Sequence, residues 1–469
     1  MTMFLALLPE IIIFISGCFL LILGLFVKNI KVINNASILL IVSVLILIIL
    51  QPFQSILENS FIVDEFSQVF KIMILIGSLS CLIMFNSSSE DLNINIYEFP
   101  ILILFASIGM MIMVSSNDLL SMFVGLELQS LSLYVLASLN RNSLLSSEAG
   151  IKYFILGALS SGLLLFGISY IYGFSGNTNF NLIAVNYNTE SLGLLIGIVF
   201  VCAGLAFKVS AVPFHMWTPD VYQGAPTPVT GFFALAPKIA AMGLLVRFLF
   251  NSFGEIYIDW QQIIIFISIA SMVFAAFAAI AQSNIKRLMA YSSIGHIGFA
   301  LIGVACASNE GLSSLVIYLM IYLIMNISVF SFILSMKRKD EYFENISDLS
   351  GLYKNHPFAA VMISLIMFSL AGIPPLAGFF AKFYIFMAAI ESNMFILSII
   401  GVLASVVGAF YYLRIVKIIY FDEPQEKFDG LSIKSLNFLF YSSSLLITVF
   451  CFYPSPVINI ANFTIKSFL

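Results

Sequence analysis

Apolar residues run along most of this chain in stretches of about twenty, separated by short polar or charged segments. At a rise of about 1.5 Å per residue, each stretch is long enough to cross the hydrocarbon core of a bilayer as a helix. The first stretch is too long for a signal peptide, so a retained helix is predicted. Fourteen spans are expected, near residues 4–26, 36–53, 66–85, 100–115, 118–139, 149–173, 191–221, 226–250, 260–281, 290–307, 312–335, 356–390, 393–420 and 436–460.

The short loops predict one integral membrane domain over residues 1–469, of the all-α polytopic class. Spans 4–8 (about 100–250) and spans 9–13 (about 260–420) form two five-helix units, flanked by spans 1–3 and span 14. In each unit the fourth span, helix 7 or helix 12, is too long for one straight crossing and contains proline. Because five is odd, the second unit enters from the opposite side, which predicts an inverted repeat.

Composition excludes most soluble classes of protein. Charged residues are 9% of the chain, against about 25% in a typical soluble domain, and hydrophobic residues are 61%. The net charge of −4 offers no basic face to nucleic acid. The five cysteines form no CxxC pair, and neither a Walker A loop nor GxGxxG occurs. We therefore expect no metal, nucleotide or redox cofactor on this chain.

Basic residues predict the orientation in the membrane. If the N-terminus is outside, the odd-to-even connections lie in the cytoplasm, where the positive-inside rule expects Lys and Arg. Most of the basic residues fall there: Lys28, Lys31, Arg141, Lys152, Lys286, Arg287, Lys337, Arg338, Lys339, Lys354, Arg414, Lys417, Lys427 and Lys434. The other side has only Arg247 and Lys466, with Lys71 a turn inside a helix.

A few ionisable residues remain deep in apolar helices: Glu127, Lys208, Lys238 and Lys382. A lysine at the centre of a membrane helix costs about 2.5–3.5 kcal/mol on insertion scales, so three of them predict a function. By contrast, side chains nearer a helix end can reach the interface with their charged groups. That interpretation is expected for Lys71, Lys152 and Arg247, and the loop pair Asp64-Glu65 is expected to be solvated.

A proline lies near each of the three deep lysines, Lys208, Lys238 and Lys382. Pro213 follows Lys208 and predicts a helix that opens just after the lysine. Pro374-Pro375 opens the other long span before Lys382, and Pro237 directly precedes Lys238 and predicts a kink. Broken spans at corresponding places of two repeats are typical of an ion site near the middle of the membrane.

Lysines favour protons over alkali ions at such a site, because an ammonium repels a cation and Glu127 is the one deep carboxylate. Burial disfavours the charged form of both lysine and glutamate, so such groups exchange protons readily. We expect a row of Glu127, Lys208, Lys238 and Lys382 to carry protons, with Glu127 and Lys208 as a coupled pair. His215 and His296 are candidate relays, although a lone histidine in a helix is as often a satisfied polar group.

These residues lie in motifs that carry a resemblance. The stretches Gly125-Leu126-Glu127-Leu128, GLAFKVSAVPFHMWTPDVYQGAPTPVTG from Gly204, Ala236-Pro237-Lys238-Ile239-Ala240, NIKRLMAYSSIGHIGF from Asn284 and AGIPPLAGFFAKFYIF from Ala371 resemble the antiporter-like membrane subunits of NADH:quinone oxidoreductase, complex I. The resemblance covers most of residues 117–390. It implies proton translocation, coupled to electron transfer from NADH to quinone in other subunits. It also implies that Glu127, Lys208, Lys238 and Lys382 are the family's transfer residues.

The same resemblance implies the partners: other membrane subunits of complex I and the lipid bilayer, with quinone, FMN and iron–sulfur clusters on other chains. Two alternatives stay open. One is a subunit of a multi-subunit cation/proton antiporter or membrane-bound hydrogenase, and the other is a non-conducting membrane scaffold. A bacterial plasma membrane is expected in preference to a mitochondrial inner membrane.

Overall fold

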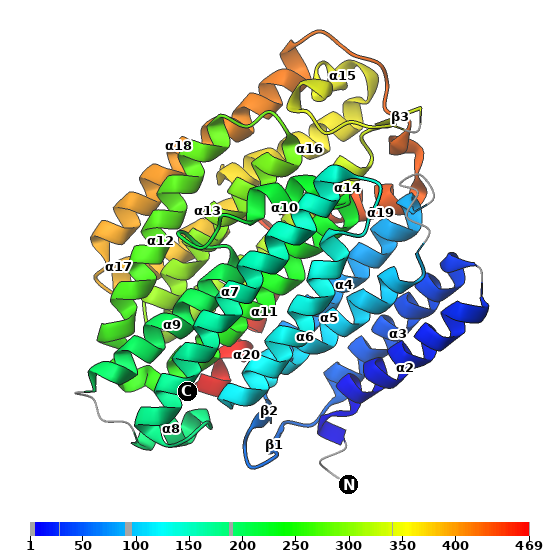
Figure 1. Ribbon diagram of the computed structural model, residues 1–469. Coiled ribbons are helices and arrows are strands. Elements are labelled where there is room, and N and C mark those ends of the chain that lie inside the picture. Colours follow the sequence, from blue (N-terminus) through cyan, green and yellow to red (C-terminus); the bar gives the residue numbers. More distant parts are fainter. Residues whose placement is uncertain (1–4, 28, 90–95, 187–190, 340, 469) are drawn as a thin grey trace.

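The computed structural model of the chain describes residues 5–27, 29–89, 96–186, 191–339 and 341–468, and most of these lie in helices (Figure 1). A helix satisfies its backbone hydrogen bonds within one segment, which lipid requires. The predicted all-α membrane class is confirmed, and Lys28 lies outside the described residues. Two short hairpins were not predicted: β1 (Gln54–Ile56) with β2 (Phe61–Val63), and β3 (Lys337–Arg338) with β4 (Glu341–Tyr342).

The first half of the chain begins with a helical hairpin at one edge of the bundle, α2 and α3, and continues into the packed interior (Figure 1). Side-chain caps mark several helix starts; Asp64 caps α4 in a capping box and Asp118 caps α6. The helices are α2 (Leu8–Phe26), α3 (Ile30–Leu50), α4 (Glu65–Ser88), α5 (Glu98–Ser115), α6 (Leu119–Ala137), α7 (Leu144–Ser175), α8 (Phe180–Asn186), α9 (Leu192–Val209), α10 (Thr218–Gly224) and α11 (Thr227–Phe253).

The second half adds a similar set of long helices, joined by short 3-10 turns η1 (Gly254–Ile256), η2 (Ile346–Leu349), η3 (Gly430–Ser432) and η4 (Lys466–Phe468). Its helices are α12 (Tyr257–Ile280), α13 (Ile285–Ala305), α14 (Asn309–Leu334), α15 (Leu352–Asn355), α16 (Pro357–Ala371), α17 (Ala377–Glu391), α18 (Phe395–Phe421), α19 (Lys434–Val449) and α20 (Ser455–Ile465). Helices α11, α13 and α14 are buried almost throughout and form the centre of the core.

Both predicted interruptions are confirmed. The span predicted over 191–221 divides into α9 and α10 around Pro213, and the span over 356–390 divides into α16 and α17 around Pro374-Pro375. Helix α11, in contrast, runs through Pro237 without interruption. The span predicted over 436–460 also breaks, which the sequence analysis missed: α19 ends at Val449 and α20 begins just after Pro454.

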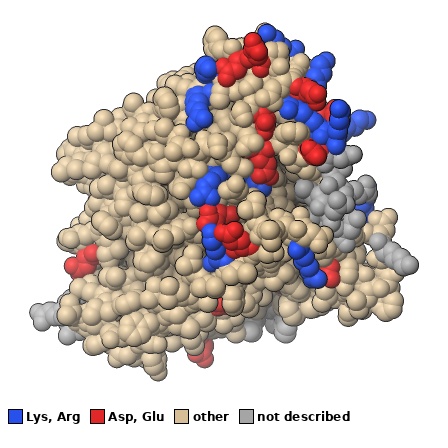
Figure 2. All heavy atoms as spheres, turned by 45° about the horizontal axis from the view of Figure 1, so that its top comes forward, with Lys and Arg blue, Asp and Glu red and all other residues tan. Residues whose placement is uncertain are grey.

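Eleven candidate membrane spans of sufficient length and hydropathy occur in the described part of the chain. This count includes α9 but omits α16, α17, α19 and α20, which are too short, and it takes α11 and α12 together as one segment, Thr227–Ile280. Fourteen spans, the inverted repeat and the orientation therefore stay predictions. Charged side chains gather toward the end of the bundle that bears α15 and β3. The left flank of the molecule in Figure 2 is largely uncharged, as expected of a surface that faces lipid.

Two expectations about charged side chains are wrong. Lys71 is fully buried and pairs with Glu10 at 2.7 Å, and Arg247 is 1% exposed and pairs with Asp64 at 2.8 Å. Neither cation reaches an interface, and Asp64 is not a solvated loop residue, because tertiary packing places an acid beside each cation. Lys152 does lie at the surface, where it pairs with Glu148 and with Asp220 of α10.

Candidate functional site

Lys208 lies in the last turn of α9, where the helix must end before Pro213. Ser210 adopts a left-handed conformation (φ 65°) and caps the helix, and the Ala211 N–H donates to the Ala206 carbonyl. The Trp217 indole N–H donates to the Phe207 carbonyl at 3.0 Å. The chain beyond the break thus satisfies carbonyls that the interrupted helix leaves free.

The Lys208 ammonium is bound by hydroxyl groups of α6. Its Nζ donates to Ser130 Oγ at 2.7 Å and to the Tyr134 hydroxyl at 3.4 Å. Glu127 lies one turn before Ser130 and accepts a hydrogen bond from Ser161 of α7. No ion pair joins Glu127 to Lys208 in the described structure. The predicted coupling would therefore act between two charges that are farther apart than an ion pair, and it stays a prediction.

Helix α6 is held close to its neighbour by small residues. A methyl group at Gly109 of α5 would meet backbone atoms of Gln129 and Gly125 at 2.5 and 2.6 Å. Backbones that approach this closely are typical of helix pairs in membranes. The contact fixes the position of the helix that presents Glu127, Ser130 and Tyr134.

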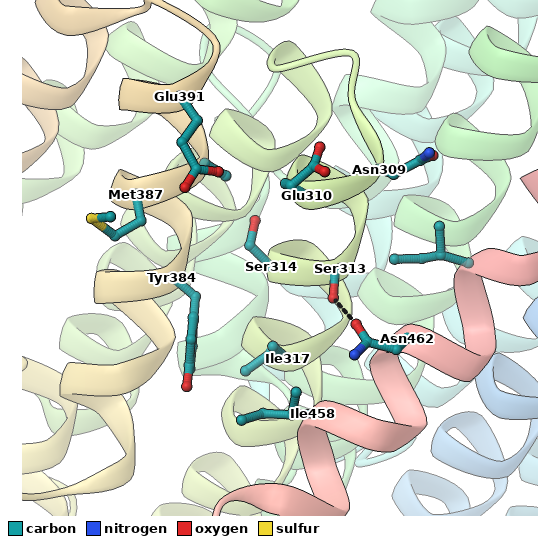
Figure 3. A pocket seen from close by; sticks show the side chains of 12 residues that line it. Asn309, Glu310, Ser313, Ser314, Ile317, Tyr384, Met387, Glu391, Ile458 and Asn462 are labelled. Carbon is teal, nitrogen blue, oxygen red and sulfur yellow. Dashed lines mark hydrogen bonds between the residues drawn. The ribbon is translucent and has the colours of Figure 1, made fainter. Parts of the chain in front are cut away.

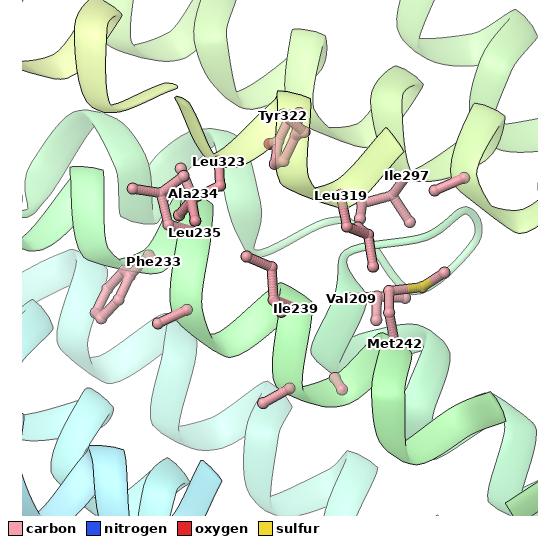
Figure 4. Close-up of a cluster of buried hydrophobic side chains, with 14 of the residues drawn as sticks. Val209, Phe233, Ala234, Leu235, Ile239, Met242, Ile297, Leu319, Tyr322 and Leu323 are labelled. Atoms are coloured by element: carbon pink, nitrogen blue, oxygen red, sulfur yellow. The ribbon is translucent and has the colours of Figure 1, made fainter. Parts of the chain in front are cut away.

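Lys238 is fully buried in the middle of α11. Its Nζ donates to Ser293 Oγ of α13 at 2.6 Å and lies 5.3 Å from the centre of the Tyr222 ring. Apolar side chains pack around this part of α11, among them Val209 of α9 and Leu319 of α14 (Figure 4). Among the described residues, Ser293 is therefore the hydrogen-bond partner of this ammonium.

Lys382 lies in α17, after the second break. Its Nζ donates to the carbonyls of Leu370 and Ala371 at 3.1 and 2.9 Å and to Ser405 Oγ of α18 at 2.8 Å. These two carbonyls end α16 and have no helical partner. The two breaks are satisfied in different ways: Lys382 donates to the free carbonyls of α16, whereas Ala211 and Trp217, which follow the break, donate to those of α9.

The two candidate histidines have different surroundings. His296 of α13 is buried, contacts the hydroxyls of Tyr318 and Tyr412, and is within electrostatic range of Lys238 and Lys382. His215 lies between α9 and α10 with its ring 4.5 Å from that of Phe274. In the described ranges no hydrogen bond or ion pair joins His215 to the other candidates, so the structure brings only His296 close to the lysines.

The hydroxyl partners were not identified from the sequence. Ser130 and Tyr134 follow Glu127 at three and seven residues, and Ser293 precedes His296 by three, so each set shares one helix face. This spacing is a usable signal, but serine and tyrosine are too common in the chain for it to select these residues. Only the packing shows which hydroxyls meet a lysine.

A hollow of about 420 Å³ lies apart from these residues, where α14, α17 and α20 meet (Figure 3). Glu310, Glu391 and Tyr384 line it, and Ser313 donates to Asn462 across one side at 3.0 Å. None of the candidate residues lines it. Among the described residues, no group of three or more His, Cys, Asp or Glu side chains is arranged to hold a metal ion.

Comparisons with known proteins cover the part of the chain that holds these residues. The family model described as "NADH:quinone oxidoreductase/Mrp antiporter, TM" matches residues 116–408. A protein of Pelagibacter ubique named NADH-quinone oxidoreductase subunit N is 51% identical over 463 residues, which cover 97% of this chain and 98% of that protein. A protein of the same name from Parvibaculum lavamentivorans is 50% identical over 472 residues, with 99% and 98% covered.

Solved structures agree in fold. A chain of respiratory complex I from Thermus thermophilus with bound aureothin is 29% identical, with a TM-score of 0.83 over 97% of this chain and 99% of that chain. A chain of the Mrp complex from Dietzia is 20% identical, with a TM-score of 0.87 over 99% and 97% of the two chains. The second likeness shows the fold alone.

Proposed function

The chain belongs to the NADH:quinone oxidoreductase/Mrp antiporter family of membrane proteins, and we propose how its buried residues serve that family's work. It acts as a multi-pass, proton-translocating membrane subunit of NADH:quinone oxidoreductase, complex I, together with the other membrane subunits. Glu127, Lys208, Lys238 and Lys382 transfer the protons, and His296 relays them between the last two. In this proposal FMN, the iron–sulfur clusters and the quinone site belong to other subunits.

One observation carries the assignment of residues. Lys71 and Arg247 are buried cations with a carboxylate partner, as a permanent buried charge requires. Lys208, Lys238 and Lys382 are equally buried, yet no carboxylate lies within 4.0 Å of them in the part of the chain that the structure describes. Hydroxyls and carbonyls accept from an ammonium, and a hydroxyl also donates to a neutral amine. These surroundings support lysines that gain and lose a proton.

The proposed transfer moves a proton between neighbouring groups, with Glu127 tuning Lys208 by its charge. An ionised Glu127 favours the ammonium form of Lys208, and when Glu127 is neutral the Lys208 ammonium gives its proton more readily to the next acceptor. His215 has no assigned step, because none of its described contacts leads to a lysine. The relatives at about 50% identity, named NADH-quinone oxidoreductase subunit N, favour complex I over a cation/proton antiporter, for which the shared family model and a likeness of fold speak.

Replacing Lys208 tests the proposal and separates a proton carrier from an electrostatic anchor. Lys208→Ala removes the carrier, whereas Lys208→Arg keeps a positive charge that cannot be released, because a guanidinium stays protonated in proteins. We expect both variants to lose most proton uptake in inverted membrane vesicles driven by NADH. Lys427→Ala, at an exposed position, is the matched control and should pump normally.

Assembly is checked first by the amount of complex in the membrane. Glu127→Gln should slow turnover, and Glu127→Asp should be milder because the charge is retained. Full pumping by Lys208→Arg would refute the carrier role, and full pumping by Lys208→Ala would favour the non-conducting scaffold.

A further inference from the structure

A hydrogen-bonded string of side chains passes through His296. Its Nδ1 lies 2.5 Å from the Tyr318 hydroxyl of α14, and its Nε2 lies 3.2 Å from the Tyr412 hydroxyl of α18. The Tyr412 hydroxyl also contacts Ser292 Oγ, one turn before His296 on α13. All four side chains are buried. Both ring nitrogens of the histidine are therefore occupied by tyrosine hydroxyls from two different helices.

Hydroxyl partners suit an imidazole that changes its protonation state. A neutral ring has one N–H donor and one acceptor nitrogen, and an imidazolium has two donors. A carbonyl only accepts and an ammonium only donates, but a tyrosine hydroxyl does either. Tyr318 and Tyr412 can therefore satisfy His296 in both neutral tautomers and in the charged form. None of these three forms leaves a buried ring nitrogen unpaired.

A small cavity lies between His296 and Lys382. Its lining includes the polar side chains of both residues and those of Ser405 and Tyr412. It leaves about 10 Å³ for water, close to the minimum of about 10–15 Å³ that holds one molecule. A buried water is held by two to four polar partners. The hydroxyls of Ser405 and Tyr412 can supply two of them, and the Lys382 ammonium supplies a third when one of its three N–H groups turns from its present acceptor to the water. The space therefore has room for about one water molecule.

We infer that Tyr412 relays a proton between Lys382 and His296 through this single water, and that Tyr318 is a positioning residue that holds the ring. Lys382 gives a proton to the water, the water gives one to the Tyr412 oxygen, and the former Tyr412 hydroxyl proton moves to Nε2. The lysine becomes a neutral amine and the ring an imidazolium, while water and tyrosine are restored. The reverse step returns the proton. The inference rests on the proposed function and adds two residues and a water site to it.

Removing single hydroxyls in the assembled complex tests the relay. Tyr412→Phe keeps the ring and should lower quinone-linked NADH oxidation and proton uptake about tenfold, since a lost proton relay costs at least that much. Tyr318→Phe should slow turnover less. In both variants the solvent deuterium isotope effect on turnover should rise, because proton transfer becomes limiting. Tyr441→Phe on α19, whose ring packs on Phe440, is the control and should behave as wild type.

Filling the cavity gives a second test that does not depend on tyrosine. Gly408 of α18 lines the cavity, and a methyl group there would approach no atom closer than 3.5 Å. Gly408→Ala therefore fits, and alanine favours the helix, so the variant should fold while displacing the water. Coupled turnover should fall. Gly173→Ala on α7, where nothing lies within 4 Å, is the matched control and should not change.

The outcomes distinguish a failure of the relay from a failure of the proposed function. Lys382→Ala, measured alongside, should abolish most pumping; if it pumps normally, the proposed function itself fails. If Lys382→Ala is impaired but Tyr412→Phe and Gly408→Ala show wild-type turnover, only the relay is refuted. An isotope effect that stays at the wild-type value in Tyr318→Phe would mean that Tyr318 merely packs. If Tyr412→Phe does not assemble, Gly408→Ala decides alone.

Discussion

Single side chains divide the buried cations of this protein into two kinds. Lys71 has an acid at ion-pair distance, and its charge holds α2 against α4. Lys238 has one serine hydroxyl and no acid within that distance among the described residues. Taking one partner from a buried ion pair leaves an uncompensated charge and costs about 3–5 kcal/mol, whereas an unpaired lysine already carries that desolvation penalty. The two kinds should therefore respond to substitution in opposite ways.

Stability measurements on two variants test this division. Glu10→Gln should lower the midpoint of thermal inactivation of the purified complex, because Lys71 then stays buried without a counter-charge. Lys238→Met should leave the midpoint unchanged or raise it, since methionine fills similar space without a charge, while proton uptake is lost. Equal losses of stability in both variants would contradict the division.

Asp64 predicts a dependence of stability on pH. Burial opposes its ionisation, but the Arg247 guanidinium at 2.8 Å and the Ser67 N–H outweigh it and hold the pKa of Asp64 below its usual value of 3.8. A carboxyl with a lowered folded-state pKa stabilises the protein above the unfolded value, and that stability is lost as the pH falls through the folded value. Asp64→Asn should therefore lower the thermal midpoint by a constant amount above about pH 5.

Below about pH 4 the difference between wild type and Asp64→Asn should begin to narrow, because the unfolded carboxyl then takes up a proton, and it should close once the pH falls below the folded-state pKa, where both have a neutral group at this position. Scans of the thermal midpoint from pH 3.5 to about 7 measure it. A difference that stays constant to the lowest pH would show that the carboxylate charge is not what Asp64 contributes.

The positions of the lysines depend on close glycine contacts between paired helices as much as on the two proline breaks. Gly167 of α7 lies against Gly197 of α9, where a methyl group would meet the Gly197 carbonyl at 2.7 Å and the Val201 N–H at 2.8 Å. Backbone atoms cannot give way as a flexible side chain does. The separation of α7 from α9, and with it the position of Lys208 relative to Ser130, depends on this absence of a side chain.

Gly167→Ala should push α9 away from α7 and lower coupled turnover several-fold, since small misplacements of transfer groups are costly. Gly162→Ala lies on the same helix with nothing within 4 Å and is the matched control, expected to pump as wild type. The measurement is proton uptake per assembled complex in inverted vesicles. Equal activity of the two variants would show that α9 is positioned by other contacts.

The whole molecule is asymmetric from end to end. The β1–β2 hairpin lies at the lower end in Figure 1 and β3 at the upper end, where the charged side chains gather in Figure 2. Ion pairs of Asp220 with Lys152 and Arg287 join α7, α10 and α13 at the charged end. The basic loops predict that this end faces the cytoplasm.

Cysteine labelling tests the orientation in intact cells. In a background without the five native cysteines, Glu341→Cys in the β3–β4 hairpin should resist a membrane-impermeant reagent added outside, and Ser55→Cys in β1 should react. Both positions are exposed, so access depends on the side of the membrane. Reaction of Glu341→Cys from outside would overturn the predicted topology and, with it, the span count.

The sequence by itself determined the helices, the two proline breaks and the cost of burying Lys208, Lys238 and Lys382. These are local properties: apolar length, a missing N–H in proline and the hydration of an ammonium act within one segment. The motifs that carry the family resemblance include these lysines. The break before Ser455 was missed although Pro454 and Pro456 are a local signal of the same kind as Pro374-Pro375.

Only the tertiary structure decided which groups meet. Glu10 and Lys71 are 61 positions apart, and Tyr318 and Tyr412 reach His296 from two other helices, so neither contact has a signature in the local pattern. A buried charge must find a partner, but which side chain supplies it depends on helix packing, and packing is set by close approaches such as Gly109 against Gly125. For that reason the sequence could single out the lysines as a candidate site, and it could not identify their hydroxyl partners.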